Sequence, residues 1–238
     1  LVGERFQVAL REYEAAIASG KDSAGLQFPE YNLDTVVMIY DDILQNYPLD
    51  DLADDACFYK AMALQKQGLN DEANDAFLEL TERFSESEYY TEANMNIGRY
   101  YFDHPKIEND QGYKLAEDAY RKVLFFRDHP QYVQALYHLG WCYYMQDRFE
   151  EAIAAFKFLI EENKLDFDPS KMDEQQVVNP LLRGEAIDYI AISFDEGDRM
   201  DDAIKFLQLI GNQDYGAMVL KRMAELREED LDYDVAAS

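Results

Sequence analysis

The sequence has little cysteine, proline or glycine, and no long run of apolar residues. Of its 238 residues, only 2 are cysteine, 6 are proline and 11 are glycine. These counts exclude a disulfide-stapled scaffold, a collagen-like chain and a low-complexity chain. No apolar run approaches the roughly 20 residues that a membrane-spanning helix needs. Cys57 and Cys142 each lie among apolar residues in a helical pattern, so we expect both to be small buried hydrophobes.

Basic residues are also scarce. The chain has 49 acidic and 22 basic residues, which gives a formal net charge of −27. Because phosphate backbones and anionic lipid surfaces repel such a chain, we expect neither a nucleic-acid partner nor direct membrane insertion. Hydrophobic residues make up 48% of the sequence, enough to bury a core. The first residues open directly into an amphipathic pattern without a signal-peptide pattern, so we take the sequence as a mature protein or part of a longer one.

No arrangement of residues in the sequence resembles a catalytic or metal site. The three histidines, His104, His129 and His138, are far apart and do not have the spacing of metal ligands. The sequence contains no phosphate-binding loop and no dinucleotide-binding glycine pattern. We therefore expect a protein that is not an enzyme and that binds no cofactor or metal.

The periodicity of the apolar residues is helical throughout, because they recur at spacings of three and four. All six prolines fall between these patterns rather than inside them. The patterns predict helices over residues 3–18, 31–46, 51–66, 70–84, 88–103, 111–127, 131–146, 149–163, 181–196, 200–210 and 214–229. Most connections between them are short, so neighbouring helices should pack as antiparallel hairpins.

A fixed pattern of small and large apolar residues repeats along the chain. One copy consists of Leu136, Leu139, Gly140, Tyr143, Ala152, Phe156 and Leu159. A second copy with the same spacing consists of Ile187, Ile190, Ala191, Phe194, Ala203, Leu207 and Ile210. Weaker copies begin near Cys57 and Asn94, and a partial one ends at Pro48. Such repeats predict stacked hairpins that share one continuous core.

Residues 136–159 resemble a tetratricopeptide repeat (TPR), with its Leu-Gly pair, Tyr three residues later, and then Ala and Phe. The resemblance implies an all-α fold, a right-handed α-α superhelix, or solenoid. We expect a single domain over 1–238 with about five hairpins, followed by a C-terminal capping helix at 213–229 and a mobile acidic tail at 230–238. Residues 164–180 form an insertion, and residues 104–111 lengthen one hairpin. The expected hairpins cover 1–48, 51–85, 88–130, 131–164 and 181–212.

The joints between hairpins carry a second, narrower resemblance. Tyr47-Pro48 and Phe84-Ser85 are similar to the joints of TPR proteins of the bacterial cell envelope, such as the barrel-assembly lipoprotein and the Tol–Pal coordinator. This resemblance favours the bacterial periplasm or the periphery of the outer membrane, while the cytoplasm stays open.

A set of side chains on the first helices of the hairpins is the candidate binding site. Tyr137, Trp141 and Tyr144 share one side of their helix, because they lie at i, i+4 and i+7. In a solenoid of this kind, that side lines the concave face. The equivalent positions predict a groove rich in aromatic residues and methionine, with acidic residues along its edge. Its further members are Phe58, Met62, Met95, Arg99, Phe102, Asp188 and Ile192.

The sequence leaves three hypotheses open for these residues. In the first, the chain is a scaffold or adaptor whose groove binds a protein or peptide segment, basic or apolar, with a basic one favoured by the acidic edge. In the second, these side chains pack against the chain's own last helix or a loop. In the third, the chain is a structural subunit or spacer of a bacterial envelope assembly and binds its partners through convex surfaces or the insertions. We do not expect a clamp for acidic C-termini, because Arg99 is the only base in the set.

Overall fold

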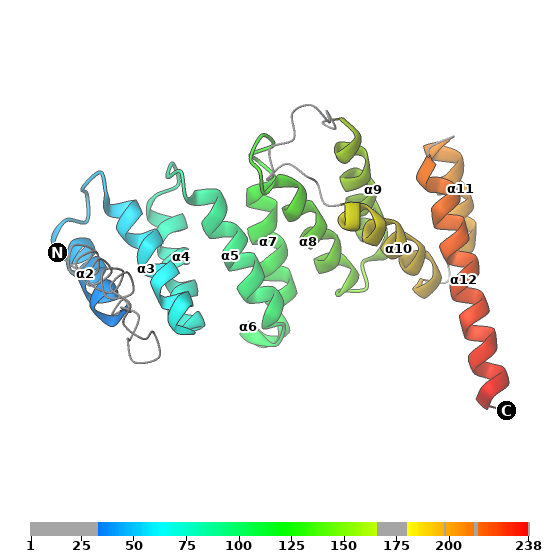
Figure 1. The fold of residues 1–238 in the computed structure, drawn as a ribbon, viewed down its shortest axis with the longest axis horizontal. Helices are drawn as coiled ribbons and strands as arrows, with labels where there is room; N and C mark the ends of the chain where they lie inside the picture. Colours follow the sequence, from blue (N-terminus) through cyan, green and yellow to red (C-terminus); the bar gives the residue numbers. More distant parts are fainter. Residues whose placement is uncertain (1–32, 166–179, 198, 212–213, 238) are drawn as a thin grey trace, which may run out of the picture. The chain divides into compact units, whose positions relative to one another are not determined.

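A computed structural model describes residues 33–165, 180–197, 199–211 and 214–237, and every regular element in these ranges is a helix (Figure 1). The predicted helix over 3–18 and most of the 164–180 insertion lie outside the described residues. The elements are α2 (Leu33–Asn46), α3 (Ala53–Gln67), α4 (Asn70–Arg83), α5 (Tyr90–Asp103), α6 (Ile107–Asp110), α7 (Gly112–Val123), α8 (Tyr132–Tyr144), α9 (Phe149–Leu165), α10 (Pro180–Glu196), α11 (Met200–Ile210) and α12 (Asp214–Ala237).

The sequence-based helices agree with this order, and three differences remain. The lengthened hairpin contains the short helix α6, which the sequence pattern did not predict. Helix α7 ends at Val123 rather than at 127, and the chain then turns through Leu124 and Phe125. The acidic tail that we expected to be mobile continues α12 as far as Ala237. Residues 230–237 contain no proline or glycine that would end the helix, and the mobility of this tail remains a prediction.

The described helices form two compact units, Leu1–Ala93 and Asn94–Ser238, and the division falls inside α5. In the first unit, α3 packs against both α2 and α4. Its core contains Cys57, Ala61, Phe77 and Leu80, each at most 1% exposed. In the second unit, α8 packs against α7 and α9, and α10 packs against α9 and α12. The single domain predicted from the sequence remains a prediction.

Three hairpins turn from their first helix to their second in the same way. The amide N–H groups of Leu69, Arg148 and Arg199 each donate a hydrogen bond to a carbonyl five residues earlier, at 2.9–3.0 Å. The first turn places Gly68 in the left-handed region, at φ 79°. The second places Asp147 there, at φ 57°. This pattern satisfies carbonyl groups at the end of the first helix. The same turn therefore occurs in three copies of the repeat.

Small residues of the repeat let two helices approach closely. A Cβ atom on Gly140 would lie 2.6 Å from the ring of Phe156, and one on Gly98 would lie 2.5 Å from the ring of Tyr120. Phe156 and Tyr120 are both fully buried. Each glycine therefore accommodates the large aromatic residue that follows it in the repeat.

Contacts between successive hairpins join positions about one repeat apart. The Tyr89 hydroxyl donates to Asp55, 34 positions away, at 2.8 Å. Arg99 donates to Gln134, and Arg127 donates to Glu162, both over 35 positions. Across the insertion, the separation is 48 positions for Tyr137 and Glu185. The first three separations are close to the length of one repeat, and the fourth is longer because it includes the insertion.

Helix α12 packs against α10, the first helix of the last described hairpin. Tyr215, Val219 and Met223 are at most 3% exposed and belong to the core of the second unit. They lie four residues apart, so they form one face of α12. The opposite side of the helix carries the exposed residues Lys221 and Glu228. One face of α12 is therefore apolar and buried, and the opposite face is polar and exposed.

Candidate functional site

Three of the predicted site residues come together in the second unit. Tyr137, Trp141 and Tyr144 on α8 are all partly exposed, and each packs against the core beneath it. The ring centroids are 6.3 Å apart for Tyr137 and Trp141, and 5.9 Å apart for Trp141 and Tyr144. Both pairs are near perpendicular, at 77° and 87°. Edge-to-face packing of this kind favours aromatic pairs.

A fourth aromatic residue, Tyr189 on α10, completes the group. Its ring centroid lies 4.1 Å from that of Trp141 and 5.4 Å from that of Tyr144. We call Tyr137, Trp141, Tyr144 and Tyr189 the aromatic cluster. The sequence analysis missed Tyr189 because it lies one position beyond Asp188 in the predicted set. Its signal in the sequence is the separation of 48 positions from Trp141, the same as between Tyr137 and Glu185.

Carboxylates lie beside the aromatic cluster. The Tyr137 hydroxyl donates a hydrogen bond to Glu185, which links α8 to α10. Burial and this neighbouring carboxylate raise the pKa of Tyr137 to about 12. Burial, and then the charges of Glu185 and Asp188, raise the pKa of Tyr189. The three tyrosines of the aromatic cluster are therefore neutral near pH 7, as is the indole of Trp141. The charges of the neighbouring carboxylates are negative.

Other predicted members of the set are placed differently. Met95 has no exposed surface, so it is a core residue of the second unit and cannot contact a partner. Phe102 is half-buried against the same core. In the first unit, Phe58 is 5% exposed and stacks on Tyr89 at 4.3 Å, while Met62 is 38% exposed. Arg99 is partly exposed and reaches Gln134 at 3.4 Å.

The last two members, Asp188 and Ile192, lie on α10, and Asp188 lies near α12. Asp188 is 3.9 Å from Arg222, and Asp195, one turn beyond Ile192, is 2.7 Å from Arg227. Ile192 itself is half-buried. The chain's own last helix thus contacts the predicted site at its α10 end. The aromatic cluster packs on α10 instead, and its rings keep part of their surface exposed.

The histidine beneath the cluster is His138. Its ring stacks on buried Tyr120, with centroids 5.1 Å apart and planes 13° apart, and the ring of Tyr137 is 5.5 Å away. Burial, and then the positive charge of Arg99, lower the pKa of His138 to about 4. A neutral, stacked imidazole supports the packing of α8 on α7.

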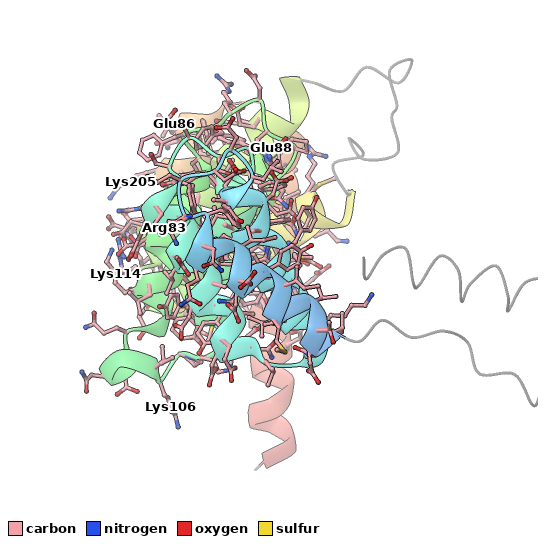
Figure 2. The ribbon with its side chains drawn as sticks, turned by 90° about the vertical axis from the view of Figure 1, so that its left-hand side faces the viewer. Arg83, Glu86, Glu88, Lys106, Lys114 and Lys205 are labelled. Carbon is pink, nitrogen blue, oxygen red and sulfur yellow. The ribbon has the colours of Figure 1, made fainter. Side chains whose placement is uncertain are left out.

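The most buried charge of the second unit is structural. Glu117 on α7 has no exposed surface and pairs with Arg148 at 2.7 Å, Arg121 at 2.9 Å and Lys114 at 3.1 Å. Lys114 projects outward from the ribbon (Figure 2). Burial alone would raise the pKa of Glu117, but the hydrogen bond from Lys114 and the charges of the three bases lower it. A carboxylate held ionised in this way joins α7 to the α8–α9 turn and is no general base.

The two cysteines are the remaining side chains with possible reactivity. Cys57 and Cys142 are free and fully buried, as predicted. Burial raises the pKa of the Cys57 thiol to about 12 and raises that of Cys142 as well. Within the described ranges, no three His, Cys, Asp or Glu side chains gather as metal ligands. Among the helices described above, none is long and apolar enough to cross a membrane.

The stacked hairpins and their repeated contacts define a helical-repeat protein. Models of the tetratricopeptide repeat family match residues 55–87 and residues 108–164. The first segment contains the α3–α4 hairpin, and the second runs from α6 to the end of α9. These two segments are thus similar to tetratricopeptide repeats, in line with the resemblance of residues 136–159. No curated protein matches the chain at a significant level of similarity.

Solved structures of other helical-repeat proteins resemble the chain over almost its whole length. The crystal structure of the MamA protein has 16% sequence identity and a TM-score of 0.51, over 94% of this chain and 96% of MamA. MamA AMB-1 has 17% identity and a TM-score of 0.52, over 95% and 93%. The TPR-like repeats of a predicted kinesin light chain from Podospora anserina have 10% identity and a TM-score of 0.53, over 94% and 97%. At these identities the likeness shows the fold alone, and it confirms the predicted all-α solenoid.

Proposed function

We propose that the chain is a protein-interaction scaffold and that the aromatic cluster binds a segment of another protein. Tetratricopeptide repeats generally mediate protein–protein interaction. The single observation that carries the proposal is the placement of Trp141. It is the only Trp of the chain, it packs on Tyr189 at 4.1 Å, and it still keeps part of its surface exposed.

The composition of the cluster supports a role in recognition. Tyr and Trp dominate binding hot spots, because they bury much surface and lose little conformational entropy. The four rings support one another through perpendicular packing, so their positions are fixed before a partner arrives. A preformed surface reduces the entropy lost on binding.

The charge beside the cluster favours a basic partner. Glu185 and Asp188 lie near Tyr189, and the chain as a whole carries a net charge of −27. An Arg or Lys side chain could contact an aromatic face and a carboxylate at once. We therefore propose an extended segment with apolar and basic residues, and no acidic C-terminus.

Selection from a random peptide library tests the proposal, because such a library samples many partner sequences at once. Phage-displayed peptides of 12 residues are selected on the immobilised chain, and we expect enrichment of peptides with Arg or Lys. Selected peptides that lack Trp are then titrated against the chain, and the emission of Trp141 is followed, because this residue is the only indole. A shift in emission that saturates reports binding beside Trp141 itself.

Two site variants and one control locate the binding surface. Tyr144→Ala and Trp141→Leu remove rings of the cluster, and we expect each to weaken binding at least about tenfold, as hot-spot residues do. Because Trp141→Leu removes the emitting group, its affinity is measured by the anisotropy of a labelled peptide. Phe125→Ala removes an aromatic side chain that is 84% exposed after α7, and it should leave the affinity unchanged. Thermal melts verify that each variant is folded. Equal binding by the wild type and both site variants rules out the cluster.

A second candidate function rests on that exposed surface. Phe125 and Phe126 are 84% and 43% exposed, and Arg127 beside them pairs with Glu162 on α9. Phe158, four residues before Glu162, is 42% exposed. In this alternative, the chain is a structural subunit of a bacterial envelope assembly whose partner covers the second helices. Its signature is a loss of binding in Phe125→Ala with no loss in Tyr144→Ala. Fractionation of cells that express the tagged protein tests the location in the envelope.

A further inference from the structure

Asp188 on α10 holds a basic side chain of the chain's own last helix. Its nearest carboxylate oxygen lies 3.9 Å from Nε of Arg222 on α12. The Asp188 side chain is 52% exposed and that of Arg222 is 27% exposed, so both can be reached from solvent. By the repeat, Asp188 occupies the position on α10 that Tyr137 occupies on α8. Each of the two residues contacts the next first helix along the chain.

The contact between Asp188 and Arg222 is the longest of the contacts that Arg222 makes with acidic residues. Arg222 also reaches Glu229 at 3.1 Å and Glu225 at 3.5 Å, both on its own helix. An Arg222 side chain that left Asp188 would therefore keep two carboxylate partners. By contrast, Arg227 forms a short ion pair, 2.7 Å, with Asp195. A partner could separate Asp188 from Arg222 at little energetic cost, because a long, exposed ion pair contributes little.

The aromatic cluster lies next to this ion pair. Tyr189 follows Asp188 directly in α10, and the charges of Asp188 and Glu185 both act on its hydroxyl. The ring of Trp141 lies 4.1 Å from that of Tyr189. A basic side chain from a bound segment that contacts Tyr189 would thus also be near the carboxylates of Glu185 and Asp188. Of the two carboxylates, Asp188 is the one that Arg222 reaches.

We propose that Arg222 is an internal competitor for the basic side chain of the partner, and that Asp188 is the carboxylate they share. The proposal rests on the proposed function of the aromatic cluster. It names one recognised group, a guanidinium or ammonium group of the bound segment, and one element that sets its affinity, α12. When the partner binds, its cation replaces Arg222 at Asp188, and Arg222 keeps Glu225 and Glu229.

A set of charge variants tests the competition. The probe is the tightest Arg-containing 12-residue peptide from the selection, together with its counterpart in which citrulline replaces the arginine. Removal of the competitor in Arg222→Gln should tighten binding of the Arg peptide about two- to fivefold, the range expected of one exposed ion pair. Asp188→Asn should weaken it by a similar factor. The double variant should bind like Asp188→Asn alone, because Arg222 then has no shared carboxylate to release.

Lys221→Gln is the matched control. It removes the same charge from the neighbouring position on α12, but Lys221 is 78% exposed and pairs with Glu225, at 3.3 Å, on its own helix. Its effect measures the change in total charge, and we expect it to be smaller than that of Arg222→Gln. The citrulline peptide should bind wild type and Arg222→Gln equally.

The outcomes separate this inference from the proposed function. A peptide that depends on Tyr144 and yet binds wild type, Arg222→Gln and Lys221→Gln equally leaves the proposed function in place and overturns the competition. The competition also fails if Arg222→Gln tightens binding as much in the Asp188→Asn background as in the wild type. Failure to select any peptide that depends on the cluster overturns both.

Discussion

Residues at equivalent positions of the repeat differ in exposure because their side chains differ in length. Met95 and Tyr137 occupy the same position in successive copies of the repeat, yet Met95 is fully buried and Tyr137 keeps part of its surface exposed. The flexible Met side chain fits wholly between helices. The longer Tyr ring extends past the core and places its hydroxyl against Glu185. Equivalent positions therefore do not guarantee equivalent exposure.

His138 gives a prediction at the scale of one residue. Its pKa is lowered to about 4 in the folded chain, against about 6.5 in an unfolded one. The unfolded chain therefore binds more protons between these values, so the stability present above pH 6.5 is lost as the pH falls toward 4. We expect His138→Phe, which keeps a ring on Tyr120, to lose about 1–2 kcal/mol less than wild type between pH 7 and pH 5.

Urea unfolding at the two pH values measures this difference. The range stays above that in which carboxylates such as Glu117 titrate. The control His104→Gln removes an exposed histidine next to Pro105, and it should keep the wild-type response. An unchanged pH response in His138→Phe would contradict the role of the buried imidazole.

At the scale of the element, the turn between the two helices of a hairpin is the feature that recurs most closely. Gly68 and Asp147 occupy the same left-handed position in two copies, at φ 79° and 57°. A residue with a Cβ is strained in this region, although Asp tolerates it better than most. The second copy thus holds strain that the first avoids.

Exchanging these residues tests the account of the turn. Asp147→Gly should raise the free energy of unfolding by about 0.5–1 kcal/mol, and Gly68→Asp should lower it by a similar amount. Chemical denaturation of both variants measures the changes. A loss of stability in Asp147→Gly would mean that the Asp side chain contributes more than its backbone costs.

The sequence predicts the helices well because each helix carries residues of the repeat, and these residues pack against repeat residues of the neighbouring helix. Gly140 and Phe156 were members of one pattern, and the structure brings them into contact. The short helix α6 lies in a segment without the repeat, so no pattern could indicate it.

The candidate site was predicted less completely. Tyr137, Trp141 and Tyr144 come together because they share one helix. Their packing on Tyr189, and the contact of Asp188 with Arg222, depend on how successive helices cross. A small rotation of one helix decides which of two adjacent side chains faces its neighbour, and a single sequence contains no measure of that rotation.

At the scale of the whole molecule, net charge opposes compactness. A chain with a net charge of −27 repels itself in the folded state more than in the extended state. The described ion pairs, including the buried group around Glu117, offset part of this repulsion. The balance between the two effects depends on salt, because salt screens long-range repulsion more than short, buried pairs.

Salt should therefore act in opposite directions on stability and on binding. From 0.05 to 0.5 M sodium chloride, we expect the melting temperature to rise by about 2–4 °C, which corresponds to roughly 1 kcal/mol in a chain of this size. Over the same range, affinity for a basic peptide should fall. Calorimetry and peptide titration measure the two responses, with choline chloride at equal ionic strength as the control for ion-specific effects. A melting temperature that falls with salt would show that ion pairs outweigh repulsion.

The short span of the contacts has a consequence for how the chain is made. The side-chain hydrogen bonds between hairpins join residues 22 to 54 positions apart within the described ranges. A polypeptide leaving the ribosome therefore presents each hairpin with nearly all of its partners as soon as the following one has emerged. Topology of this local kind folds quickly, because little loop-closure entropy must be lost before contacts form. The segment between α9 and α10 adds residues that must be synthesised before α10 emerges. We therefore expect assembly to be delayed between the emergence of the aromatic residues of α8 and that of Tyr189, which packs on Trp141.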